Sequence, residues 1–184
     1  ISRLIVVIVL SLAVVFTGGC VYWNTFYNAK KAFNTAEKTR KARRLRGGRV
    51  KADLYQLAIE KSLKVIENYP NSKYYDDALF VLGVSYYYTN KFVSSERRLR
   101  ELLANYPESK FAKEAELYLA KCMLELKAEI DALELFWRVF ETDFDEEFKA
   151  EAALALGDYY FRERNFERSR QYDQSLRDSL GSEE

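Results

Sequence analysis

One short motif occurs twice in the chain and constrains its fold more than any other feature. Asn-Tyr-Pro-x-Ser-Lys begins at Asn68 and again at Asn105, a step of 37 positions. The same step relates three sets of small residues, which are Gly83, Ala120 and Gly157; Ala78, Ala115 and Ala152; and Ala58, Ser95, Ala132 and Ser169. A period in the thirties with small residues at fixed offsets is typical of stacked helical hairpins, which bury a core only against their neighbours. We therefore expect an all-α superhelical array of about eight helices.

The repeated residue types predict how each hairpin is built. Gly83 and its counterparts let the two helices approach closely, and Ala58 and its counterparts do the same from the other side. Large rings lie three residues before Ala58, Ser95 and Ser169 and are expected to wedge between helices; these are Tyr55, Phe92 and Phe166. Pro70 and Pro107 end the second helix because proline lacks an amide hydrogen. The predicted repeat domain covers residues 20–184, in approximate units 22–72, 73–109, 110–146 and 147–184.

The second unit carries a recognisable pattern. Leu79-x-x-Leu82-Gly83-x-x-Tyr86, then Ser95-x-x-x-Leu99 and Pro107, resembles the tetratricopeptide repeat. This resemblance implies a concave groove lined by the first helix of each hairpin. Helical periodicity places the following residues in that groove: Phe80, Val84, Tyr87, Tyr88, Leu117, Lys121, Leu124, Leu154, Asp158, Phe161 and Arg162. We interpret this mostly apolar strip as a docking surface for a polypeptide, with hairpin packing as the alternative for any single ring.

The N-terminal residues have the pattern of an export signal. An apolar run at residues 4–16 follows Arg3 and precedes Thr17-Gly18-Gly19-Cys20, and it is too short to span a bilayer. Two glycines before a cysteine resemble the bacterial lipobox, which implies a lipoprotein signal peptide at residues 1–19 and lipidation of Cys20. An ordinary signal or anchor with an incidental cysteine is the alternative. Val21, in place of aspartate, implies sorting to the outer membrane.

The charge of the chain is divided unevenly along the sequence. Residues 30–51 hold ten Lys or Arg and one acid, Glu37, whereas residues 52–184 hold 18 basic and 27 acidic residues. Apolar residues at steps of three and four predict an amphipathic helix from Asn24 to about Arg44. Its basic side either contacts anionic lipid headgroups or is a solvated face beside an acidic array. Nucleic acid is not an expected partner, because no aromatic residues are interleaved with the basic ones.

The composition argues against an enzyme. The chain has no histidine, which removes the commonest general base and most zinc ligand sets. Cys122 lies on an apolar helix face and is predicted to be a small buried residue. The acids Asp143, Asp145 and Glu146 are interpreted as the start of a helix, where they favour the helix dipole. We predict no catalytic residue, no metal, no cofactor and no small-molecule substrate.

The combination of a lipobox, an aromatic first helix and repeats closed by Tyr-Pro-x-Ser-Lys resembles the BamD (YfiO) family of outer-membrane lipoproteins. That resemblance implies a lipid-anchored scaffold on the periplasmic face of the outer membrane. Its implied partners are β-barrel proteins or subunits of their assembly machinery. Envelope lipoproteins that coordinate cell division, and a structural spacer without peptide binding, are the alternatives. Because the helix from Asn165 to about Ser179 has an apolar side, we also expect a polar capping unit to follow it in the full-length protein.

Overall fold

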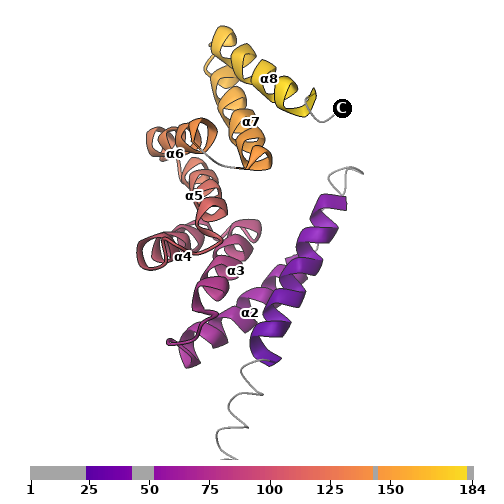
Figure 1. Ribbon diagram of the computed structural model, residues 1–184, viewed down its shortest axis with the longest axis vertical. Helices are drawn as coiled ribbons and strands as arrows, with labels where there is room; N and C mark the ends of the chain where they lie inside the picture. The colour runs from indigo at the N-terminus through magenta and orange to yellow at the C-terminus, as the bar shows by residue number, and fades with distance from the viewer. Residues whose placement is uncertain (1–23, 43–51, 143–144, 182–184) are drawn as a thin grey trace, which may run out of the picture. The chain divides into compact units, whose positions relative to one another are not determined.

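The computed structural model describes residues 24–42, 52–142 and 145–181, and these residues form eight helices and no strand. Residues 24–42 form the N-terminal helix, and the others are α2 (Ala52–Asn68), α3 (Tyr75–Tyr88), α4 (Phe92–Asn105), α5 (Ala112–Glu125), α6 (Glu129–Glu141), α7 (Glu146–Arg162) and α8 (Phe166–Gly181) (Figure 1). The prediction of an all-α fold is confirmed. The expected signal peptide at residues 1–19, Cys20 and Asp143 lie outside the described residues. No helix in the described part of the chain is long and apolar enough to cross a membrane.

The helices form two compact units, the first ending at Thr89 and the second beginning at Asn90. In the second unit each helix packs against the next one along the chain, and α5 also contacts α7. This nearest-neighbour packing, visible in Figure 1, is the pattern expected of helical hairpin repeats.

The core of the first unit lies between the N-terminal helix, α2 and α3. Phe26 packs with Val65 and Ala78 and stacks on Tyr74 at a centroid distance of 4.9 Å. Phe33 contacts Tyr55 of α2 at 6.4 Å and Phe80 of α3 at 6.0 Å, both edge to face. The N-terminal helix therefore occupies the place of the first helix in a hairpin with α2.

The second unit buries small residues at the predicted positions. Ala120 and Gly157, and likewise Ser95, Ala132 and Ser169, are buried. A Cβ atom added at Gly157 would lie 3.6 Å from Tyr172 Cβ and 3.8 Å from the Ser169 carbonyl oxygen, which shows how closely α8 approaches α7. The predicted wedge rings differ among the repeats: Tyr55 is buried, Phe92 is half-buried and Phe166 is exposed. Phe166 begins α8, where its ring contacts Phe161 rather than the core.

The turn within each hairpin repeats with the 37-residue period. Asn90, Lys127 and Arg164 all have positive φ, at 60°, 66° and 59°, and their numbers differ by 37. In the second and third of these turns the backbone forms a Schellman motif: Ala128 N–H donates to Met123 O, and Asn165 N–H donates to Tyr160 O, both at 2.9 Å. A left-handed residue therefore ends the first helix of each of these hairpins.

The turn between hairpins also repeats. The backbone N–H of Ser72 donates to Tyr69 O at 3.1 Å, and that of Ser109 donates to Tyr106 O at 3.0 Å. Each serine hydroxyl in turn accepts from the N–H two residues later, at Tyr74 and Phe111. The lysine that follows each serine lies over the ring of the next residue, at 5.0 Å for Lys73 and 4.7 Å for Lys110. The motif that predicted the repeat thus forms the same local structure twice.

Candidate binding surface

The structure separates the predicted groove residues of α3 into core and surface. Phe80 and Val84 are buried, and Phe80 packs against Phe33 of the N-terminal helix. Tyr87 and Tyr88 are half-buried, and their rings meet edge to face at 5.2 Å. Of these four predicted residues, only Tyr87 and Tyr88 therefore offer ring surface to a partner.

Tyr88 belongs to a cluster of rings and charges. Its ring stacks on Tyr55 at 4.9 Å, and the Arg40 guanidinium lies 5.0 Å above it. The Tyr55 hydroxyl donates to Glu37 Oε1 at 2.5 Å, and Arg40 pairs with the same carboxylate at 2.7 Å. Burial raises the pKa of Tyr55, and the hydrogen bond to Glu37 raises it further. This cluster ties the C-terminal half of the N-terminal helix to α2 and α3.

On α5, the predicted groove residues mainly join helices. Leu117 is buried and Leu124 is half-buried. Lys121 pairs with Glu151 of α7, and its ammonium lies 4.9 Å from the ring of Tyr118. The pair fixes α5 against α7, in agreement with the contacts between these two helices.

The predicted residues on α7 form an open strip. Leu154 is 38% exposed and Phe161 is 62% exposed, and Asp158 and Arg162 are also exposed. These positions follow steps of four, three and one, so they lie on one side of the helix, and we call them the α7 strip. Phe161 meets the exposed ring of Phe166 edge to face at 5.6 Å. The strip and Phe166 combine apolar contact area with one charge of each sign.

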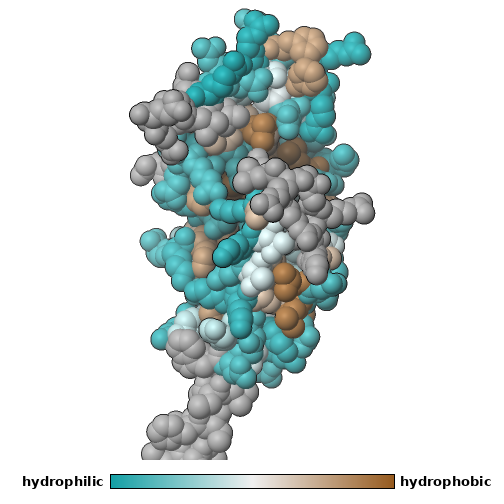
Figure 2. All heavy atoms as spheres, turned by 90° about the vertical axis from the view of Figure 1, so that its right-hand side faces the viewer, coloured by the Kyte–Doolittle hydropathy of each residue, from teal (hydrophilic) through white to brown (hydrophobic). Residues whose placement is uncertain are grey.

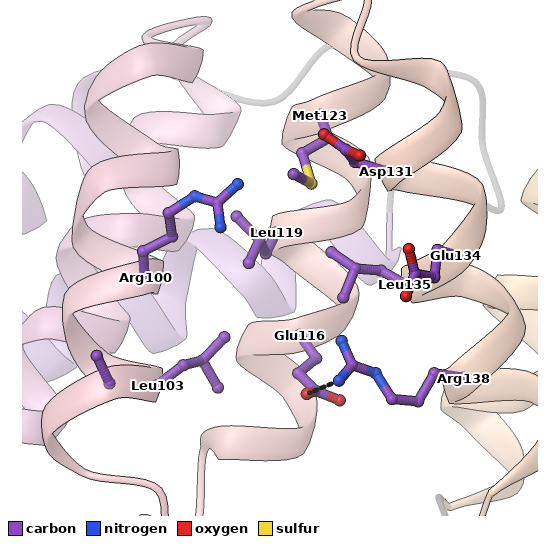
Figure 3. Close-up of a pocket in the computed structure, with 10 residues that line it drawn as sticks. Arg100, Leu103, Glu116, Leu119, Met123, Asp131, Glu134, Leu135 and Arg138 are labelled. Carbon is purple, nitrogen blue, oxygen red and sulfur yellow. Dashed lines mark ion pairs between the residues drawn. The ribbon is translucent and has the colours of Figure 1, made fainter.

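A hollow that the groove prediction missed lies on α4, α5 and α6. It has a volume of about 670 Å³ and is lined by Arg100, Leu103, Ala104, Glu116, Leu119, Met123, Asp131, Glu134, Leu135 and Arg138. Figure 3 shows leucines and Met123 between charged side chains, with Glu116 paired to Arg138 at 3.7 Å. Most of these residues come from the second helix of a hairpin. The groove prediction considered only the first helix of each hairpin, so it could not include them. The hydrophobic positions of α4 and α6 were the signal that could have found it.

Cys122 is held in an unreactive form, and the described acids predicted at a helix start lie there. Cys122 is buried and donates to Ser95 Oγ at 3.0 Å, and burial raises the pKa of its thiol to about 11. The thiol therefore stays protonated at neutral pH, which makes it a poor nucleophile. Asp145 precedes α7, and Glu146 lies in its first turn, as the helix-start interpretation expects. The described residues contain no group of three His, Cys, Asp or Glu side chains that could hold a metal ion.

Comparison with known proteins supports the repeat architecture. The family model described as a tetratricopeptide repeat-like domain matches residues 3–183. None of the curated proteins matches the chain.

Proposed function

Since the chain belongs to the tetratricopeptide repeat-like domain family, we propose that it is a helical scaffold that binds a polypeptide through the α7 strip and Phe166. The observation that carries this proposal is the pair of contacting, exposed rings, Phe161 at 62% and Phe166 at 54%, on the same helical hairpin as Leu154. Large exposed apolar patches are rare on soluble monomers, and aromatic residues, phenylalanine included, are enriched at protein interfaces.

The chemistry of the strip suggests the kind of peptide that it accepts. Leu154 and Phe161 lie two helical turns apart, about 10 Å, with Asp158 and Arg162 beside them. A segment with apolar side chains at a similar spacing could cover both, and polar groups next to them could pair with the two charges. An amphipathic segment fits this surface better than a highly charged tail.

The finer part of the proposal concerns location. The apolar run at residues 4–16 before Cys20 supports a lipoprotein anchored in the outer membrane and facing the periplasm. The resemblance to the BamD (YfiO) family supports a partner among outer-membrane proteins or their assembly machinery. An envelope lipoprotein that coordinates cell division accommodates the same sequence features. A structural spacer does not require the exposed rings of Phe161 and Phe166.

Site-specific photocrosslinking tests the binding surface. A photoreactive residue at Phe161, in the full chain within envelope membranes, should give a discrete adduct with one protein or a few. The same residue at Ile130, which is 83% exposed on α6, serves as the control and should give none. With the crosslinked partner purified, Phe161→Ala combined with Phe166→Ala should weaken binding by at least tenfold, because each anchor ring typically contributes about 2 kcal/mol. No adduct from position 161, or equal adducts from both positions, would support the spacer instead.

Mass spectrometry of the membrane-bound protein tests the anchor. The mature chain should begin at Cys20 and carry acyl chains on that residue. An unmodified Cys20, or a mature N-terminus elsewhere, would remove the lipoprotein part of the proposal and leave the binding surface untouched.

A further inference from the structure

The exposed side of the N-terminal helix has an unusual composition. Seven exposed residues between positions 24 and 41 lie on one side of this helix, and we call this surface the lysine face. Its members are Asn24, Tyr27, Lys30, Lys31, Asn34, Lys38 and Lys41. The opposite side carries the buried residues Phe26, Ala29, Phe33 and Ala36. Figure 2 shows the molecule from the right-hand side of Figure 1, and hydrophilic residues cover most of the lower part of that view, beside a smaller hydrophobic patch. The lysine face is therefore the outer side of a helix whose inner side is fixed in the core.

No carboxylate belongs to the lysine face. The single acid of this helix, Glu37, is half-buried on the inner side, where it pairs with Arg40 and accepts from Tyr55. Lys30, Lys31 and Lys38 form no ion pair with any residue that the structure describes. The helix thus keeps its negative charge inside and presents only positive charge outside.

The rest of the chain has the opposite charge. Residues 52–184 carry 18 basic and 27 acidic residues, while the net charge of the whole chain is only +1. An anionic surface would attract the lysine face and repel the remainder. Such a charge distribution gives a protein a preferred orientation without a strong overall attraction.

The geometry of the lysine face fits a flat, extended anionic surface. From Tyr27 to Lys41 it is about 21 Å long, and a helix lying parallel to a bilayer would hold every lysine within the screening length of about 8 Å. Lysine ammonium groups are mobile point charges that suit dispersed headgroups. Tyr27, 56% exposed in their midst, is a residue type enriched at membrane interfaces. One exposed aromatic residue is too few to form a stacking platform for nucleic acid.

We propose that the lysine face binds the surface of an anionic phospholipid bilayer, with the N-terminal helix lying parallel to it. The proposal rests on the membrane location argued above, because the helix begins at Asn24, four residues after the proposed lipid anchor at Cys20. The acyl chains proposed on Cys20 supply attachment to any bilayer, and the lysine face supplies a preference for anionic lipid and sets the orientation of the repeats.

Vesicle binding by the full chain separates these two contributions. The protein is mixed with vesicles of phosphatidylcholine alone, or of phosphatidylcholine with phosphatidylglycerol, at low and at high salt. Each lysine near an anionic surface contributes about fivefold in affinity, so the wild type should prefer the anionic vesicles by at least tenfold at low salt. The preference should fall at high salt, because salt screens exposed charges.

The decisive variant is Lys30→Gln with Lys31→Gln and Lys38→Gln, which should lose the anionic preference. The control is Arg97→Gln with Lys127→Gln and Arg170→Gln, which removes the same number of exposed charges from α4, the α5–α6 turn and α8. The control should keep the preference. Circular dichroism verifies that both variants are folded.

Three results would overturn the proposal. In the first, the lysine-face variant keeps the preference for anionic vesicles. In the second, the control variant loses as much of that preference as the lysine-face variant, which would indicate a general effect of charge. The variant could also lose self-association while its lipid preference stays unchanged, which would assign the face to a second copy of the chain. Weak binding to phosphatidylcholine vesicles with the anionic preference intact would contradict the anchor and support the lysine face.

Discussion

Two of the hairpin turns place a long basic side chain where glycine is the favoured residue. Lys127 and Arg164 have positive φ at the ends of α5 and α7, where a side chain strains the backbone. Lys127→Gly and Arg164→Gly should each raise the free energy of unfolding by about 0.5–1 kcal/mol, because the relief of strain exceeds the entropy that glycine adds to the unfolded chain. Urea denaturation measures the change.

Asparagine tolerates the left-handed conformation, so Asn90→Gly should have a smaller effect. Arg97→Gly, on the exposed side of α4, should lower stability by about 1 kcal/mol. A loss of stability in Arg164→Gly as large as in Arg97→Gly would show that the turn is not strained.

Buried serines make a second test at the same scale. The hydroxyl oxygens of Ser62 and Ser85 are buried and have no hydrogen-bond partner among the described residues, whereas that of Ser95 accepts from Cys122. Ser62→Ala and Ser85→Ala should leave stability unchanged or raise it by about 1 kcal/mol, because they remove an unsatisfied polar group. Ser95→Ala should lower stability, because it leaves the Cys122 thiol without its acceptor. Equal losses in all three variants would contradict this distinction.

The sequence predicted the small buried positions but not the strained turns. Alanine, glycine and serine at a fixed period indicate close helix contacts, because a larger side chain would hold the helices apart. Lys127 and Arg164 give no such signal, since their residue types favour a helix rather than a left-handed turn. Phe166 shows the opposite error. Its large aromatic side chain led to the prediction that it is buried between helices, but at the start of α8 the ring is exposed.

At the scale of helices, the N-terminal helix is the element whose role the sequence described least well. The 37-residue step relates Ala58 of α2 to the later hairpins but gives no counterpart for a residue of the N-terminal helix. In the structure Phe33 contacts both α2 and α3, so the helix takes part in the core of the first unit. Repeat spacing could not show this, because residues 43–51 shift the helix out of the 37-residue register.

Phe33→Ala should therefore destabilise the first unit by about 3–5 kcal/mol, the usual cost of truncating a buried phenylalanine. Tyr27→Ala, on the exposed side of the same helix, should change stability by less than about 0.5 kcal/mol. Amide hydrogen exchange provides the regional measurement, and Phe33→Ala should speed exchange in α2 and α3. Unchanged exchange there would show that this helix is dispensable for the unit.

On α3, the groove prediction placed residues on a surface that the structure shows to be mostly buried. All ten residues from Asp77 to Tyr86 are buried, so this helix is covered on every side. A helical period identifies which residues share a side, but it cannot identify the open side of a helix that is apolar all round. On α7, where Leu154 and Phe161 are exposed, the same projection gave a surface.

For the whole molecule, the absence of histidine determines how stability responds to pH. No side chain of this sequence ordinarily titrates between about pH 5.5 and 8, so the free energy of unfolding should be nearly constant there. Burial raises the pKa of Cys122 from 9.0 to about 11 and that of Tyr172 from 10.0 to about 12. Above about pH 9 the unfolded chain loses these protons first, so stability should fall as the pH rises toward 12.

Urea titrations at a series of pH values test this expectation. Tyr172→Phe removes one of the groups whose pKa is raised, so this variant should lose less stability between pH 10 and 12 than the wild type. A stability that rises above pH 9 would contradict the direction of both shifts.

The matching turns between α2 and α3 and between α4 and α5 have a consequence for how an array of this kind can change its length. The segments beginning at Tyr69 and Tyr106 have the same residue pattern and the same backbone hydrogen bonds, so a genetic crossover between them joins chain ends of matching geometry. Unequal recombination at these points would add or delete residues 73–109 as one complete hairpin, with both junctions preserved. The number of hairpins can thus vary in whole steps, and a new copy arrives with its turns already suited to the neighbours on either side.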